Sequence, residues 1–191
     1  MPEGWEDGWR AFHHGVHVGR FWVGPPWEDA PRGAVTVVID PGRAFGTGAH
    51  ATTRLCIIAL EELERGSLLD VGCGSGVLSI AAAKLGFAPV LAVDADAAAI
   101  EATRSNARAN GVVFEARRLD ALVDAPPPAN VAVANIALDV VEALGARIEC
   151  DRLVTSGYLE TSDPTLPRFS HVKRRTLDGW AADVWQASAA G

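Results

Sequence analysis

Two acids on either side of a glycine-rich turn are the residues whose spacing most clearly indicates chemistry. Asp70 ends one apolar stretch, three alternate glycines follow (Gly72, Gly74 and Gly76), and Asp94 ends the next apolar stretch. Glycine turns tightly at positive φ and lets a ligand approach the backbone. A carboxylate at the second strand end can accept hydrogen bonds from both hydroxyls of a ribose. The spacing predicts a nucleotide-type cofactor site, with an ordinary structural turn as the alternative.

The form of this motif distinguishes between two classes of cofactor. The nicotinamide-dinucleotide fingerprint has glycine at its sixth position, where this chain has Val77. No catalytic Tyr–Lys or His–Asp arrangement stands out either, so a nicotinamide oxidoreductase is disfavoured. The G-x-G-x-G form with acids at both strand ends resembles the S-adenosylmethionine site of class I methyltransferases. The resemblance implies that Asp70, Gly72, Gly74 and Asp94 bind this cofactor.

A glycine-rich segment earlier in the chain narrows the family. Residues 40–53 read DPGRAFGTGAHATT, a composition that suits a loop folding over a ligand or an ordinary connector. The string closely resembles a segment of the PrmA family, the lysine methyltransferases of large-subunit ribosomal protein eleven. The resemblance implies that Thr53 binds the cofactor, with Phe45, Gly46 and Thr47 beside it.

An amide at the end of a later apolar stretch is the candidate for the chemical step. Residues 131–134 are apolar and Asn135 follows them, which predicts an amide at the carboxyl end of a strand, beside the cofactor. Methyltransferases of planar or amide nitrogens often show Asn-Pro-Pro-aromatic here, whereas residues 135–138 read NIAL and resemble the PrmA pattern. The resemblance implies that Asn135 lies at the cofactor and holds the substrate amine with its lone pair aimed at the methyl group. A cap for the following helix is the alternative.

Two further polar residues have both a functional and a structural interpretation. Asp120 follows the third strand of the expected sheet, where many class I enzymes hold the adenine amino group with an acid or an amide. A helix-capping aspartate is the alternative. His50 lies in the glycine-rich segment, where it either contacts substrate or stabilises the loop.

The histidines and cysteines do not predict a metal site. His13, His14 and His17 could bring two imidazoles to one helical face, but no nearby carboxylate or cysteine completes a ligand set. The three cysteines share no C-x-x-C spacing and are odd in number, which is typical of reduced thiols in a cytosolic protein. We therefore expect no metal.

The elements that must position these residues alternate in the order typical of an α/β fold. The expected strands lie near 34–39, 67–71, 90–94, 112–117, 130–134 and 152–157, and the expected helices near 52–66, 76–86, 96–110 and 138–148. A last hairpin joins 172–176 to 180–185. Trp180 and Trp185 are expected to pack in its core or at its edge. The pattern predicts a mostly parallel Rossmann-like sheet of the class I methyltransferase type, closed by an antiparallel hairpin.

Length and composition limit the organisation and the partners. The 191 residues suit one catalytic domain over 34–191, preceded by a Trp-rich segment or lid over 1–33. A net charge of −7 disfavours direct nucleic-acid binding. Because no apolar run could span a membrane and no signal peptide is evident, we expect a cytoplasmic protein.

These inferences together predict an S-adenosylmethionine-dependent N-methyltransferase. The resemblance implies an acceptor lysine or amino terminus on a protein, possibly a ribosomal protein. A methyltransferase for a small amine or another protein is one alternative, and a noncatalytic S-adenosylmethionine-binding module is another. PrmA proteins usually carry a separate N-terminal recognition domain, whereas this chain begins near the linker. We therefore expect weaker methylation of the ribosomal protein, or a different substrate recognised through residues 5–27.

Overall fold

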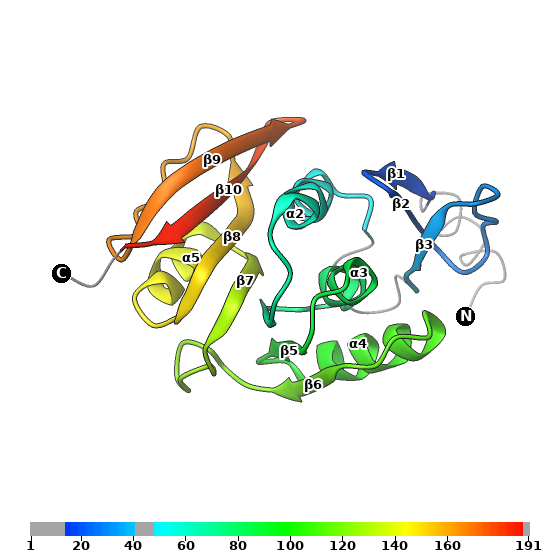
Figure 1. The fold of residues 1–191 in the computed structure, drawn as a ribbon, viewed down its shortest axis with the longest axis horizontal. Helices are drawn as coiled ribbons and strands as arrows, with labels where there is room; N and C mark the ends of the chain where they lie inside the picture. Colours follow the sequence, from blue (N-terminus) through cyan, green and yellow to red (C-terminus); the bar gives the residue numbers. More distant parts are fainter. Residues whose placement is uncertain (1–13, 41–47, 189–191) are drawn as a thin grey trace, which may run out of the picture.

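The larger of the two sheets has seven strands and runs along the lower and left parts of the view in Figure 1. The computed structural model describes residues 14–40 and 48–188. The strands are β4 (Leu68–Val71), β5 (Val90–Asp94), β6 (Glu115–Arg118), β7 (Ala129–Asn135), β8 (Cys150–Leu159), β9 (Phe169–Leu177) and β10 (Trp180–Ala187). Their order is β6-β5-β4-β7-β8-β10-β9, in which β10 alone pairs antiparallel, with β8 and β9. The predicted α/β sheet with a C-terminal antiparallel hairpin is confirmed.

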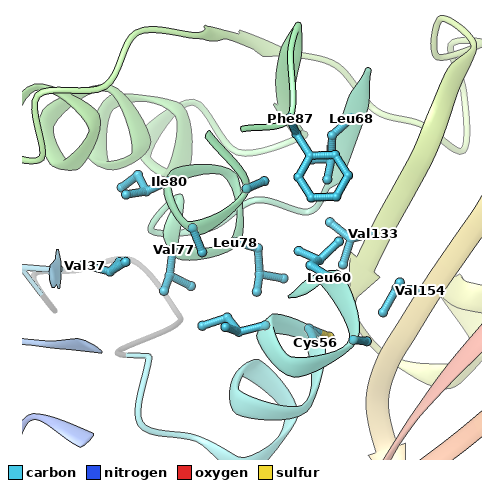
Figure 2. Close-up of a cluster of buried hydrophobic side chains, with 14 of the residues drawn as sticks. Val37, Cys56, Leu60, Leu68, Val77, Leu78, Ile80, Phe87, Val133 and Val154 are labelled. Atoms are coloured by element: carbon cyan, nitrogen blue, oxygen red, sulfur yellow. The ribbon is translucent and has the colours of Figure 1, made fainter. Parts of the chain in front are cut away.

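Helices cover both faces of this sheet. Neighbouring residues of each strand point to opposite sides, and apolar residues on both sides must be buried. Leu68 packs in one cluster with residues of α2 (Ala51–Glu62) and α3 (Val77–Leu85), whereas Leu69 packs in another with Val141 of α5 (Leu138–Gly145). The fourth helix, α4 (Ala97–Ala109), contacts β5 and β6. Figure 2 shows the first cluster, in which Leu68 and Val133 from the sheet face the side chains of α2 and α3.

The four expected helices are present, and their ends differ from the expected ones by up to four residues. We expected helix α2 to begin at Thr52 or Thr53, but it begins at Ala51 with His50 as its N-cap. The imidazole Nδ1 of His50 accepts a hydrogen bond from the backbone N–H of Thr52 at 3.4 Å. Histidine is not among the preferred capping residues, so the sequence did not indicate this role.

A second, three-stranded sheet precedes the main one in the chain. It consists of β1 (Val16–Val18), β2 (Phe21–Gly24) and β3 (Val35–Val38), with β2 antiparallel to β1 and parallel to β3. Phe21 and Val23 are buried in the same cluster as α2 and α3. The boundary we expected between residues 33 and 34 therefore falls inside one packed sheet. His17 lies on strand β1 rather than on the helical face we had considered, because residues 16–24 form a hairpin.

The C-terminal hairpin turns at the residues that the sequence indicated. Asp178 and Gly179 both have positive φ, 51° and 80°, which two-residue hairpin turns require. In the part of the chain that the structure describes, no helix combines the length and the apolar character needed to cross a membrane.

Candidate active site

Several predicted site residues that the structure describes lie where the strand order of the main sheet reverses. Strand β4 lies between β5 and β7, and the helices that follow β4 and β7 cover opposite faces. In open α/β sheets ligands bind in the crevice that this arrangement leaves at the carboxyl ends of the strands. Asp94 and Asn135 are the last residues of β5 and β7, and Asp70 is the third of four residues in β4.

Two adjoining cavities open at this edge of the sheet. The first has a volume of about 490 Å³, and Thr53, Gly74 and Asn135 line it. The second has a volume of about 250 Å³ and is walled mostly by apolar side chains, with Asp120 at its border. Gly72, Asp94 and Ile136 line both cavities. An elongated ligand with a polar middle and one flat apolar end matches this shape.

Residues 72–76, which we call the glycine loop, need glycine for two physical reasons. Gly72, Gly74 and Gly76 have φ values of 72°, 53° and 83°, in the region that other residues rarely adopt. A Cβ on Gly72 would also lie 2.5 Å from Cγ2 of Ile136, at the wall shared by the two cavities. The missing side chains keep the backbone of the glycine loop accessible from the first cavity.

Asp94 fixes the glycine loop while it faces both cavities. Its Oδ2 accepts a hydrogen bond from the backbone N–H of Gly74 at 3.0 Å, and its Oδ1 accepts one from the N–H of Asp96 at 2.9 Å. Each carboxylate oxygen has a second lone pair, so the group can still accept hydrogen bonds from a ligand. This is the position expected for a ribose-binding acid.

Asp70, which we expected to bind the cofactor, lies one residue before the end of β4. It is 1% exposed and lies beneath the glycine loop, with the Ser79 backbone N–H at 3.1 Å and the Ser79 hydroxyl at 2.6 Å from its Oδ2. Burial raises the pKa of Asp70 to about 6, with a further increase from the charge of Asp94, although both Ser79 hydrogen bonds lower it. In this structure Asp70 anchors helix α3 and lines neither cavity.

Asn135 forms a hydrogen bond with Thr53, a residue of helix α2 that lies 82 positions earlier in the chain. Its Nδ2 donates to the Thr53 hydroxyl at 3.3 Å, and Thr53 is 2% exposed in the first turn of α2. The N-cap of α5 is Ala137, which makes no side-chain hydrogen bond, so Asn135 does not cap that helix. The structure thus joins two predicted site residues at the wall of the first cavity.

Asp120 closes a turn and borders the second cavity, and it caps no helix because residues 121–124 form a turn. Its Oδ1 accepts a hydrogen bond from the backbone N–H of Leu122 at 3.0 Å, so the side chain closes a turn after β6. The residue also lines the second cavity, beside Leu119 and Ala121. The expected ligand contact at Asp120 stays a prediction.

Two residues that line the first cavity, Trp180 and Gly157, were not predicted as part of the site. Trp180 lines the first cavity, and its ring packs edge-to-face against His50 with centroids 4.9 Å apart. The expectation that Trp180 serves packing alone was incomplete, whereas Trp185 is buried and donates to the Thr155 hydroxyl. Gly157 lies within strand β8, and a Cβ there would lie 2.1 Å from the carbonyl oxygen of Ile136. An isolated glycine in a strand is the one sequence feature that could have indicated this close approach.

The remaining predictions concern metals and segments outside the described residues. Phe45, Gly46, Thr47 and His13 lie in these segments. Among the residues that are described, no group of three or more His, Cys, Asp or Glu side chains is arranged to hold a metal ion.

Comparison with known proteins decides the family. The sequence model of the family described as "Ribosomal protein L11 methyltransferase (PrmA)" matches residues 2–187. The chain belongs to the PrmA family. It is 40% identical to the ribosomal protein L11 methyltransferase of Legionella pneumophila strain Lens, over 95% of this chain and 68% of that protein. It is 46% identical to the protein of the same name from Pectobacterium carotovorum, over 94% of this chain and 62% of that protein.

Solved structures agree with the PrmA assignment. A ribosomal protein L11 methylase from Lactobacillus delbrueckii superimposes with a TM-score of 0.79 at 27% identity, covering 91% of this chain and 98% of that one. An RNA methyltransferase from Salinibacter ruber, solved with S-adenosyl-L-homocysteine, gives a TM-score of 0.57 at 20% identity, covering 70% and 89% of the two chains, and shows the shared fold. The chain is an S-adenosylmethionine-dependent methyltransferase of the class I fold.

Proposed function

We propose that this PrmA family member methylates an amine nitrogen of a protein, with ribosomal protein L11 as the acceptor. The observation that carries the proposal is the Asn135–Thr53 pair, which places an amide at the wall of a cavity adjoining a nucleotide-sized one. The names of the relatives, ribosomal protein L11 methyltransferase, support the choice of acceptor.

The two cavities fit the parts of S-adenosylmethionine. We assign the ribose hydroxyls to Asp94, because its carboxylate borders both cavities. The adenine then occupies the apolar second cavity, with its amino group toward Asp120. The amino-acid part lies along the glycine loop, where Gly72 and Gly74 leave room for it. Asp70 supports this site from below through α3.

Residues 45–47 and Thr53 complete the proposed cofactor site. The PrmA resemblance of the segment over 40–53 supports a contact from Phe45, Gly46 and Thr47, and Thr53 already lines the first cavity. We therefore place the reacting end of the cofactor in the first cavity, between the glycine loop and Asn135.

Asn135 has the chemistry needed to orient an amine. Because its Nδ2 donates to Thr53, its Oδ1 remains to accept a hydrogen bond from an incoming N–H. An amine that donates its N–H to this oxygen keeps its nitrogen lone pair free to attack the methyl group of the cofactor. When bound, S-adenosylmethionine supplies a methyl group on a cationic sulfonium, so the protein's main task is alignment.

The walls of the first cavity favour the uncharged form of a substrate amine. A lysine ammonium has an ordinary pKa near ~10.4 and must lose a proton before it can attack. Val77, Leu78 and Ile136 give the cavity apolar walls, and removing an ammonium from water lowers its pKa. Desolvation would therefore increase the fraction of neutral amine.

One alternative has a different methyl acceptor, and the other transfers no methyl group. A small amine could also enter the first cavity, and a noncatalytic module would need only the cofactor contacts. The Asn135–Thr53 pair favours catalysis, because it leaves the Asn135 Oδ1 at the cavity wall to orient an amine, which cofactor binding alone would not need. The net charge of −7 favours a protein acceptor over direct nucleic-acid binding, and a ribosomal acceptor places the enzyme in the cytoplasm.

A transfer assay with purified components tests the proposal. The chain is incubated with methyl-labelled S-adenosylmethionine and, in separate reactions, ribosomal protein L11, a small-amine mixture or the proteins of a cell lysate. We expect label on lysine or amino-terminal nitrogens of L11, located by peptide mass spectrometry. Label on another protein or on a small amine alone would contradict the acceptor. Cofactor binding with no transfer in any reaction would support the noncatalytic alternative.

A further inference from the structure

Helix α4 carries two buried polar residues that do not serve their own helix. Thr103 is fully buried and Asn106 is 4% exposed, and they lie three positions apart, on one side of α4. A buried polar side chain is costly unless hydrogen bonds satisfy it. The hydrogen-bond partners of Thr103 and Asn106 therefore indicate the role of these two side chains.

Both side chains bind the glycine loop. The Thr103 hydroxyl donates to the carbonyl oxygen of Gly74 at 3.0 Å and lies 3.3 Å from the sulfur of Cys73. Asn106 Nδ2 donates to the carbonyl oxygen of Ser75 at 2.9 Å. Because Asp94 holds the N–H of Gly74, this glycine is fixed on one side by β5 and on the other by α4.

The packing between α4 and the glycine loop is equally close. A Cβ on Gly76 would lie 2.9 Å from Cγ2 and 3.1 Å from the Cα of Thr103. The glycine loop therefore rests directly on the surface of α4. Two side chains of that helix hold the carbonyl groups of Gly74 and Ser75, while Asp94 and Val93 hold N–H groups of the same loop.

Asn106 also reaches a second segment near the site. Its Oδ1 accepts a hydrogen bond from the backbone N–H of Asp40 at 3.2 Å, directly before residues 41–47 in the chain. The amide of Asn106 thus connects the glycine loop to Asp40, which lies two residues after the end of β3. The bond to the Ser75 carbonyl needs a donor, and the bond from the Asp40 N–H needs an acceptor. A side-chain amide provides both, whereas a carboxylate or an alkyl side chain does not.

We infer that Thr103 and Asn106 are positioning residues that set cofactor affinity by holding the backbone of the glycine loop. They act through Gly74 and Ser75 and line neither cavity themselves. The inference rests on cofactor use by this site and is independent of the acceptor, so it can be tested without one.

Calorimetric binding of S-adenosylhomocysteine to four single variants tests the inference. Thr103→Val keeps the side-chain shape but leaves the Gly74 carbonyl without its donor, and we expect binding about tenfold weaker. Thr103→Ser restores the hydroxyl and should bind within about twofold of wild type. Asn106→Leu should weaken binding at least as much as Thr103→Val.

Asn130→Leu is the control, because Asn130 bonds Ser67 and Asp151 at the amino-terminal end of β7, away from the site. It should bind the ligand as wild type does, even if it loses stability.

Unchanged affinity in Thr103→Val, or an equal loss in Thr103→Ser, would overturn the inference. If Asn106→Leu does not fold, the two Thr103 variants still decide, because valine keeps the methyl group and loses the hydroxyl, whereas serine keeps the hydroxyl and loses the methyl group. A wild-type chain that does not bind S-adenosylhomocysteine would overturn the cofactor assignment itself, and the inference with it.

Discussion

The amide of Asn135 and the hydroxyl of Thr53 meet at 3.3 Å, although 82 positions separate them in the chain. One ends strand β7 and the other lies in the first turn of α2. The contact links the fourth strand of the parallel sheet to the segment that resembles the PrmA family most closely. It also fixes which atom of the amide remains for a substrate.

Replacing Asn135 by alanine should separate binding from chemistry. The loss of an oriented acceptor for the amine should lower kcat about 10²-fold, a size typical of removing one positioned polar group. The affinity for S-adenosylhomocysteine should stay within about threefold, since Asp94 and the glycine loop are untouched. Steady-state kinetics and calorimetry measure the two effects, and Asn130→Ala is the matched control. Wild-type turnover in Asn135→Ala would make this residue structural.

Thr53→Val tests whether the pair acts as a unit. Valine keeps the shape and removes the acceptor for Asn135 Nδ2, so the amide should lose its fixed orientation and kcat should fall about tenfold. In the double variant with Asn135→Ala, the Thr53 change should have little further effect on kcat, because the group that it orients is gone. A double-mutant cycle on kcat measures this coupling. Fully additive losses would show that the two residues act independently.

Asp94→Ala should reduce cofactor affinity. The substitution removes the proposed ribose contacts and also the acceptor that holds the N–H of Gly74. We expect S-adenosylhomocysteine to bind about 10- to 100-fold more weakly, from the loss of hydrogen bonds to a charged group. Asp96→Ala is the control, because Asp96 caps α4 through the N–H of Ala98 and lines neither cavity. Equal affinities in wild type and Asp94→Ala would refute the assignment of this acid.

The buried carboxyl of Asp70 should make stability depend on pH. Burial, and secondly the charge of Asp94, raise its folded-state pKa from 3.8 to about 6. The folded state therefore holds the proton more tightly than the unfolded state does. This contribution is complete below pH 3.8 and is lost as the pH rises through about 6.

Urea unfolding of wild type and Asp70→Asn measures this dependence. The wild-type free energy of unfolding, relative to that of Asp70→Asn, should fall by up to about 2–3 kcal/mol between pH 4 and pH 7. Asparagine cannot titrate, so it removes the effect of this one group. A difference that stays constant or rises with pH would mean that the pKa of Asp70 is not raised.

The main sheet was predictable because its residues repeat a strong pattern. Apolar stretches of four to six residues that end in an acid or amide, such as those before Asp94 and Asn135, predict buried parallel strands. The small sheet was only partly predictable. Residues 34–39 read as a strand, whereas β1 and β2 are short and rich in glycine and aromatic residues, and depend on packing against α2 and α3.

The site was predictable where a motif fixes local backbone, and less so where tertiary contacts decide. The glycine loop and Asp94 follow from strand and turn spacing alone. Trp180 enters the site because the last hairpin returns beside β8, a long-range pairing that no local pattern encodes. The burial of Asp70 likewise depends on how α3 packs over β4. There the backbone N–H and the hydroxyl of Ser79 both donate to the Asp70 carboxylate.

A crystal structure of the chain with S-adenosylhomocysteine tests the central claim most directly: the two adjoining cavities form one cofactor site. The account predicts the ribose hydroxyls on the Asp94 carboxylate, the adenine beside Leu119 and Ala121, and the thioether sulfur facing the first cavity near Asn135. A ligand bound elsewhere, or an adenine in the first cavity with Asp94 making no ribose contact, would contradict it.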